Sequence, residues 1–102
     1  MSIPPDDAVT IAPDIHKLVY DDEELRILDV HVKPGEKAGM HRHPRNITYI
    51  LKGGMLRFTD ETWKTKDVTF ADGHTAHMPE TLHAVENTGQ SEIHAIQIEF
   101  KK

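Results

Sequence analysis

The sequence predicts a single small all-β domain, built as an antiparallel jelly-roll barrel. Three observations lead to this fold class: many short segments with strand-like alternation, closely spaced turn signals, and no segment with a sustained helical period. Short strands separated by frequent turns are typical of β-sandwiches and barrels. A length of 102 residues is that of one domain with a small core.

The N-terminal part is expected to be an arm and an edge strand (residues 1–24), followed by the barrel (residues 25–102). Pro4, Pro5 and Pro13 indicate that residues 1–13 are extended rather than helical. Residues 14–20 are expected to form a short strand and residues 21–24 a charged turn. Residues 25–33 alternate, with an apolar face made of Leu28, Val30 and Val32.

Turn signals divide the rest of the chain into further short strands. Turns are expected at residues 34–36, 52–54, 60–61 and 71–73. The strands between and after them are expected within residues 47–51, 55–59, 63–70, 75–79, 83–88 and 93–100. Residues 87–90 carry a hairpin signal. In the last strand, Ile96, Ile98 and Phe100 share one face, and Gln97 and Glu99 share the other.

Composition restricts the class of function. Twelve basic residues against seventeen acidic ones give a net charge of −5, which argues against non-specific nucleic-acid binding. The chain has no cysteine, which excludes disulfides, zinc–thiolate sites and a thiol nucleophile, and fits a reducing cytoplasm. It has no apolar run suited to a signal segment or a membrane span. We therefore expect a cytoplasmic protein that binds neither nucleic acid nor membrane.

His41 and His43 are the first candidates for a functional site. Residues two apart in a strand point to the same face, so both imidazoles can turn toward one metal ion. A lone His-x-His pair more often faces water. Here Gly35 before the pair and Gly53-Gly54 after it bound the strands, and a second histidine-rich segment follows at residues 73–89.

Together these two segments resemble the motifs of the cupin superfamily (RmlC-like jelly-roll proteins). The first cupin motif runs Gly, five residues, His-x-His, three or four residues, Glu, six residues, Gly. Gly35, His41 and His43 match it, and Asn46 stands six residues before Gly53, where the family has Glu. The gap between His43 and Asn46 is one residue shorter than usual.

The second cupin motif runs Gly, five residues, Pro-x-Gly, two residues, His, three residues, Asn. Gly73 and Pro79 match its first half, and His83 and Asn87 match its second half. Thr81 replaces the family Gly, and the middle of the motif is one residue short. The resemblance covers about residues 25–100, and it also extends to a subgroup of very short bacterial single-domain cupins.

The resemblance implies that His41, His43 and His83 bind one divalent transition-metal ion (Fe, Zn, Ni, Mn or Cu). Three imidazole ligands with vacant positions are typical of a catalytic metal. Asn46 cannot supply the charge of the family Glu, although its carbonyl oxygen could ligate weakly; Thr48 is the alternative if the register slips by one. Three neutral ligands leave the +2 charge uncompensated, which favours an anionic small-molecule ligand.

Other polar residues are weaker candidates. His77 could enter the barrel as a fourth ligand or as a hydrogen-bond donor to one, although a surface position is commoner. Arg45 and Arg57 could contact a substrate carboxylate, although a solvated charge is commoner for each. His16, His31 and His94 match no motif position, and we expect them on the surface or at an interface.

The leading functional hypothesis is a metal-dependent enzyme, dioxygenase-like or a lyase or isomerase, acting on a small anionic organic molecule. The alternative is a non-catalytic cupin module that binds a metal or small ligand; a third possibility is an empty site in a dimer scaffold. Unpaired strand edges and apolar Ile3, Val9, Ile11 and Ile15 also predict a homodimer, with residues 3–20 packed on the neighbouring barrel.

Overall fold

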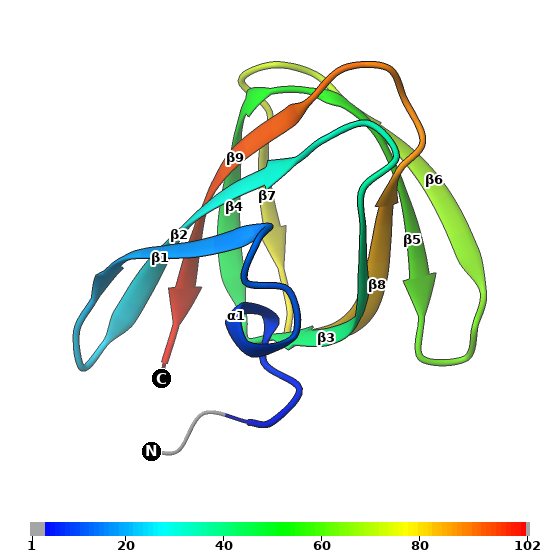
Figure 1. Cartoon of the computed structure of the whole chain (residues 1–102). Coiled ribbons are helices and arrows are strands. Elements are labelled where there is room, and N and C mark those ends of the chain that lie inside the picture. Colours follow the sequence, from blue (N-terminus) through cyan, green and yellow to red (C-terminus); the bar gives the residue numbers. More distant parts are fainter. Residues whose placement is uncertain (1–3, 102) are drawn as a thin grey trace.

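The computed structural model describes residues 4–101 as two antiparallel sheets that face each other and enclose a barrel (Figure 1). One sheet has the strand order β1-β2-β9-β4-β7 and the other the order β3-β8-β5-β6. This confirms the predicted antiparallel jelly-roll. The elements are α1 (Ala8–Ile11), β1 (His16–Asp21), β2 (Leu25–Val32), β3 (Lys37–His43), β4 (Asn46–Lys52), β5 (Gly54–Asp60), β6 (Thr65–Phe70), β7 (Thr75–Met78), β8 (Thr81–Asn87) and β9 (Ile93–Phe100).

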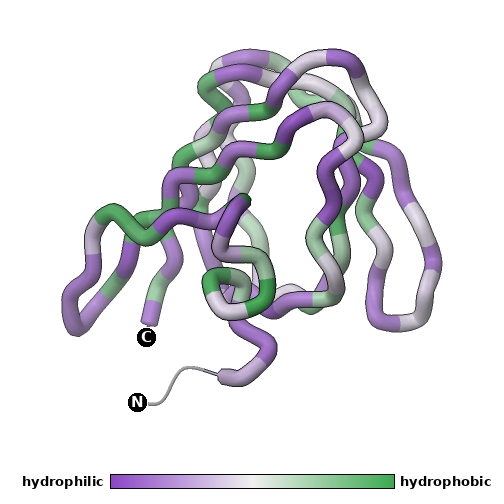
Figure 2. The backbone as a smooth tube through the Cα atoms, viewed as in Figure 1, coloured by the Kyte–Doolittle hydropathy of each residue, from purple (hydrophilic) through white to green (hydrophobic). Residues whose placement is uncertain are grey.

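Alternation along the strands sets the interior of the barrel. In β2, Leu28 and Val32 are buried, as the apolar face predicted from the sequence requires. The core cluster joins Val32 to side chains from both sheets, including Ile93 and Val85. Hydrophobic and hydrophilic segments alternate along β2 and β9 (Figure 2), which is the pattern of strands with one face inside.

In β9 the interior face is apolar at its start, with Ile93, and polar toward its end. Ala95, Gln97 and Glu99 are buried, whereas Ile96, Ile98 and Phe100 are only partly buried on the outer face. Cross-strand pairing places Ile98 between Ile27 of β2 and Ile47 of β4. The outer face of the five-stranded sheet therefore carries a row of apolar side chains.

The N-terminal segment differs from the predicted extended arm. After Pro4 and Pro5 the chain forms the short helix α1, whose first turn is capped by the side chain of Asp7 accepting a hydrogen bond from the backbone N–H of Val9 (3.1 Å). The segment lies across one end of its own barrel (Figure 1), where Ala8 and Ile15 are buried.

Strand β1 follows this segment and pairs with β2 at the edge of the five-stranded sheet. Ile15 is thus buried within the same chain rather than against a neighbour, and Ile3 lies outside the described residues. The expected homodimer stays a prediction, because a single chain does not test it.

The turn at residues 87–90 is present, but it is not a hairpin. Strands β8 and β9 belong to different sheets, so the turn carries the chain from one sheet to the other. The Asn87 side chain fixes this crossing: its amide nitrogen donates to the carbonyls of Val32 (2.8 Å) and Ser91 (2.9 Å), and its oxygen accepts from the N–H of Gly89 (2.9 Å).

Gly53 is required by a close backbone approach. A Cβ atom at this position would lie 2.0 Å from the carbonyl oxygen of Phe70, so no larger residue fits between β4 and β5. Among residues 4–101, no helix has the length and apolar character needed to cross a membrane.

Candidate metal centre

Three of the predicted histidines meet inside the barrel. His41 and His43 lie two residues apart on β3 and are both buried. β3 pairs with β8 so that His83 lies directly opposite His41. The ring centroids are 4.9 Å apart for His41 and His43, 4.9 Å for His41 and His83, and 5.3 Å for His43 and His83. Strand register thus gathers residues from two distant segments.

His16 is a fourth member of this cluster, and its predicted surface or interface position is wrong. It is only 4% exposed, and its ring centroid lies 5.0 Å from that of His41 and 5.1 Å from that of His43. One ring nitrogen of each of His16, His41 and His43 lies within 4.8 Å of the others, close enough to hold one ion. His83 is not part of this closest group, although its ring centroid lies 4.9 Å from that of His41. His16 is the first residue of β1, and it precedes both histidine motifs in the sequence.

The orientation of these rings is set through their Nδ1 atoms. Nδ1 of His41 lies 2.6 Å from the carbonyl oxygen of Gly39, and Nδ1 of His16 lies 3.1 Å from that of Ala12. A carbonyl oxygen can only accept, so each Nδ1 carries the proton and each Nε2 keeps a free lone pair. The bulge in β3 between Ala38 and His41 positions Gly39 for this contact.

His43 is oriented in the same way by a carboxylate. Its Nδ1 lies 2.5 Å from Oε2 of Glu99. Among the described residues, Nε2 of His41 is a buried nitrogen without any hydrogen-bond partner. An unpaired buried acceptor is costly, and a metal ion would satisfy it. This orphaned atom, among imidazoles with the same tautomer, fits a transition-metal ion.

The cluster histidines are neutral at pH 7. Burial, reinforced by the neighbouring imidazoles, lowers the pKa of His16, His43 and His83 from 6.5 to about 3. Burial also lowers the pKa of His41. A neutral imidazole is the form that ligates a metal, so these four side chains need not lose a proton to bind one.

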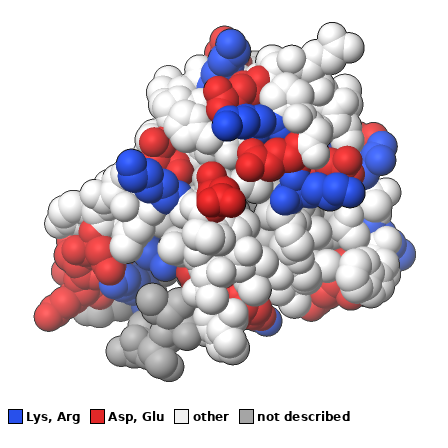
Figure 3. Space-filling view, in the orientation of Figure 1, with Lys and Arg blue, Asp and Glu red and all other residues white. Residues whose placement is uncertain are grey.

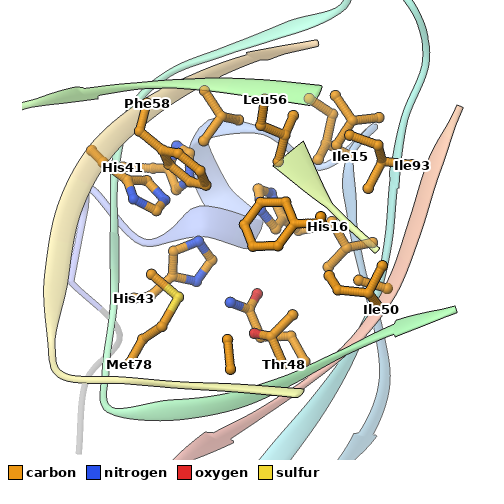
Figure 4. Close-up of a pocket in the computed structure, with 18 residues that line it drawn as sticks. Ile15, His16, His41, His43, Thr48, Ile50, Leu56, Phe58, Met78 and Ile93 are labelled. Atoms are coloured by element: carbon orange, nitrogen blue, oxygen red, sulfur yellow. The ribbon is translucent and has the colours of Figure 1, made fainter. Parts of the chain in front are cut away.

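The cluster opens onto an apolar cavity of about 80 Å³ (Figure 4). Its walls come from both sheets and include Ile50, Leu56, Phe58 and Met78. The described residues that line it include no Lys, Arg, Asp or Glu. The imidazoles are therefore the main polar groups available to a molecule in the cavity.

Glu99 belongs to a buried ionic network that supports the cluster. Its Oε1 accepts from Nε of Arg26 at 2.5 Å, and Arg26 in turn donates to Oδ1 of Asp7 at 2.6 Å. Glu99, Asp7 and Arg26 are all buried. Burial raises the pKa of Glu99, and the guanidinium of Arg26 opposes that rise. The network ties the N-terminal segment to His43.

No sequence motif includes Glu99. Alternation along β9 places it on the same face as Gln97, but alternation alone does not show that this face lies inside the barrel. A ligating histidine whose second nitrogen donates to a carboxylate is a recurrent arrangement in metal sites.

Asn46 is fully buried, but its side chain is already hydrogen-bonded. Its oxygen accepts from Oγ1 of Thr48 (2.9 Å) and from Nε2 of Gln97 (3.3 Å), and its nitrogen donates to the carbonyl of Pro44 (2.9 Å). Thr48 lines the cavity, whereas Asn46 does not. Asn46 thus stabilises the barrel wall through its hydrogen bonds and does not face the cluster. The fourth side chain at the cluster is that of His16.

His77 and the two candidate arginines lie outside the barrel. In β7, Ala76 and Met78 line the cavity, so His77 is exposed on the opposite face, 3.2 Å from a guanidinium nitrogen of Arg45. Arg45 also lies over the ring of Phe100, 4.3 Å from its centroid.

Arg57 is an exposed residue paired with Asp67 at 2.8 Å. Neither Arg57 nor Arg45 lines the cavity, so the substrate contact expected of them stays a prediction. A charged ligand in the cavity would meet no arginine there.

Comparison with known proteins finds likeness in structure and not in sequence. No family model matches the chain, and no curated protein matches its sequence. Among solved structures, a cupin domain from Bordetella pertussis superposes with a TM-score of 0.79 at 23% identity, covering 86% of this chain and 93% of that one.

Two further cupin structures superpose over a similar extent. An RmlC-like cupin family protein with a double-stranded β-helix fold from Methanocaldococcus jannaschii has a TM-score of 0.67 at 15% identity, covering 84% of this chain and 78% of that one. A cupin superfamily protein from Desulfitobacterium hafniense has a TM-score of 0.64 at 14% identity, covering 86% and 77%.

Proposed function

Because the chain has the cupin fold and gathers four imidazoles inside it, we propose that it binds one divalent transition-metal ion there and acts on a small anionic organic molecule. His41, His43 and His83 would hold the ion, and His16 would add a fourth nitrogen. The single observation that carries this proposal is the buried, unpartnered Nε2 of His41 in the midst of the cluster.

The four imidazole nitrogens limit which metal ions could both bind here and remain open to a substrate. Nitrogen ligands suit Fe, Zn, Ni, Cu and Mn. A tetrahedral ion such as zinc would be saturated by four imidazoles, whereas an ion that takes five or six ligands would keep positions open for a substrate. Catalysis therefore favours iron, nickel or manganese, or requires one of the four histidines to stay unligated.

The surroundings favour an anionic ligand of small size. Four neutral imidazoles contribute no charge that would balance the charge of the ion. The cavity lining has no Lys or Arg, so the ion would be the one positive group that an anionic ligand meets there, and the cavity limits that ligand to a small size. When bound, the ion would supply Lewis acidity or, if it is iron, activation of O2. The apolar walls would exclude water and strengthen the attraction between the ion and a carboxylate, enolate or phenolate.

Metal analysis of the purified protein, with the His41→Ala/His83→Ala variant beside it, tests the ion. One equivalent should be present in the wild type and lost in the variant. Cobalt-loaded protein then tests ligand access, because the visible spectrum of Co²⁺ reports its coordination. Millimolar acetate or benzoate should change that spectrum, and oxygen-uptake screening with iron-loaded protein tests for oxidative chemistry.

A non-catalytic metal-binding module is the second candidate. The small cavity and a full set of four nitrogen donors favour it, because a saturated ion has no position for a substrate. In that case the cobalt spectrum would be insensitive to added anions while the metal stays bound at one equivalent. Acidic and basic side chains are mixed on the face shown in Figure 3, so this face has no continuous basic patch of the kind that binds nucleic acid. Neither candidate function requires one.

A further inference from the structure

A second group of metal-ligating side chains lies on the outside of the five-stranded sheet. Asp29 and His31 are two residues apart on β2, so they share its outer face. His94 of β9 is the cross-strand partner of His31. The inward neighbours in these strands, Val32 and Ala95, belong to the buried core, so the sheet separates this group from the interior cluster.

The three side chains converge on one point. Nε2 of His94 lies 2.6 Å from Oδ1 of Asp29, and Nε2 of His31 lies 3.4 Å from Oδ2 of the same carboxylate. The two imidazole rings are stacked, with centroids 3.9 Å apart and planes inclined by 16°. Both rings therefore present the same nitrogen to the same carboxylate.

We propose that Asp29, His31 and His94 form a second divalent metal site, with donors suited to ions such as Zn²⁺ or Cu²⁺. One ligand atom from each residue lies within 4.8 Å of the other two, so an ion could be held after small side-chain rotations. Two imidazole nitrogens and one carboxylate oxygen are a donor set that such ions favour.

Binding an ion would change the protonation of these rings. A carboxylate oxygen only accepts, so Nε2 of His94, 2.6 Å from Oδ1 of Asp29, carries its proton in the metal-free protein. An ion bound through this nitrogen would displace that proton to Nδ1 or to solvent. The side chains of Asp29, His31 and His94 are partly exposed, so the ion would exchange with solvent and solvent would complete its coordination.

Without an ion, the same residues form a hydrogen-bonded group in which Asp29 links two histidines. If this hydrogen-bonded group is their only role, no ion binds at this place, and the experiments below distinguish that outcome from the proposal. The proposal is independent of the interior function, since the two sites share no residue and lie on opposite faces of the sheet.

Zn²⁺ titration of the full-length protein, first stripped of metal with a chelator, tests the second site by calorimetry. We expect two equivalents for the wild type and one for either His94→Ala or His41→Ala/His83→Ala, so loss of the outer site and loss of the interior site are distinguishable. His77→Ala, which removes another exposed histidine, is the matched control and should retain two. Circular dichroism checks that each variant is folded.

Nuclear magnetic resonance provides a readout that does not depend on the interior variant folding. Zn²⁺ should shift the ring protons of His31 and His94 together in the wild type, and Asp29→Asn should abolish this shift. An unchanged stoichiometry in His94→Ala, or ring shifts that persist in Asp29→Asn, would overturn the proposal. Equal loss of zinc in His77→Ala would assign the binding to exposed histidines in general and would overturn it too.

Discussion

Glu99 accepts a hydrogen bond from Nδ1 of His43 across 2.5 Å, although the two residues are 56 positions apart in the chain. The same carboxylate is paired with Arg26, which is paired with Asp7 of the N-terminal segment. His43 is thus held by a buried network that begins at one end of the chain and passes through the last strand. The properties of the metal centre should depend on residues that never touch the ion.

Replacing Glu99 with Gln should weaken metal binding at the interior cluster by about 10- to 100-fold, the usual cost of removing a carboxylate behind a ligating histidine. The amide keeps the shape of the side chain but loses the charge that would make His43 a better ligand for the proposed ion. Competition with a chromophoric chelator measures the affinity. Glu61→Gln, an exposed change in the turn after β5, is the control. If Glu99→Gln binds metal as tightly as Glu61→Gln does, the role given to Glu99 is contradicted.

Replacing Arg26 with Leu should lower the free energy of unfolding by about 3–5 kcal/mol, because two buried carboxylates would lose their cation. Urea denaturation measures the change. Arg57→Leu is the matched control: its pair with Asp67 is exposed, so its loss should cost less than about 1 kcal/mol. Similar costs for the two variants would show that the buried network does not stabilise the fold.

Replacing His16 with Ala should weaken metal binding at least about tenfold if the fourth imidazole is a ligand. His74→Ala, an exposed histidine on the loop before β7, should leave the affinity unchanged. The measurement is the same chelator competition. If His16→Ala binds metal as tightly as the wild type, His16 is not a ligand, and only His41, His43 and His83 would hold the ion.

The metal-free protein should lose stability as the pH falls below 6.5. The folded-state pKa of His16, His43 and His83 is about 3, whereas the unfolded chain takes up these protons near 6.5. The unfolded state therefore binds more protons between these values, and each imidazole lowers the stability by up to about 1.4 kcal/mol per pH unit.

Urea denaturation between pH 7 and pH 5, above most carboxylate titration, measures this slope. His83→Gln removes one of the titrating groups and should flatten it, whereas His74→Gln should not. A wild-type stability that is constant over this range would mean that the cluster histidines take up protons without unfolding.

The homodimer predicted from the sequence should form through residues 3–20, as expected there. Within this part of the chain Ile11, Val19 and Tyr20 are exposed, and exposed apolar side chains favour burial against another surface. Val19→Asp on the edge strand β1 should lower the dimer fraction in analytical ultracentrifugation, whereas Met55→Asp, an exposed position on β5, should not. A monomeric wild type at micromolar concentration would contradict the prediction.

Much of the fold could be predicted from local patterns. The alternation in residues 25–33 and the turns around Gly35, Gly53 and Gly73 give the strands, because side chains alternate along a strand and turns need specific residues. The spacing of His41, His43 and His83 also placed these residues in matching motif positions, and the structure brings all three together.

Local patterns could not say which face of a strand is inside. In β7 the interior face carries Ala76 and Met78, so His77 points outward; in β9 it carries Gln97 and Glu99 rather than Ile96 and Ile98. Alternation has the same period for both faces, so the choice depends on what each strand packs against.

A small antiparallel β-barrel and three histidines at metal-ligand spacing follow from the sequence alone. The folded arrangement adds that His16 lies beside these histidines, that Asn46 is hydrogen-bonded to Thr48 and Gln97, and that Glu99 orients His43. Strand periodicity and motif spacing are properties of neighbouring residues and can be read along the chain. The contacts of His16 and Glu99 join the two ends of the chain across the barrel, and they exist only once both sheets and the N-terminal segment have packed together.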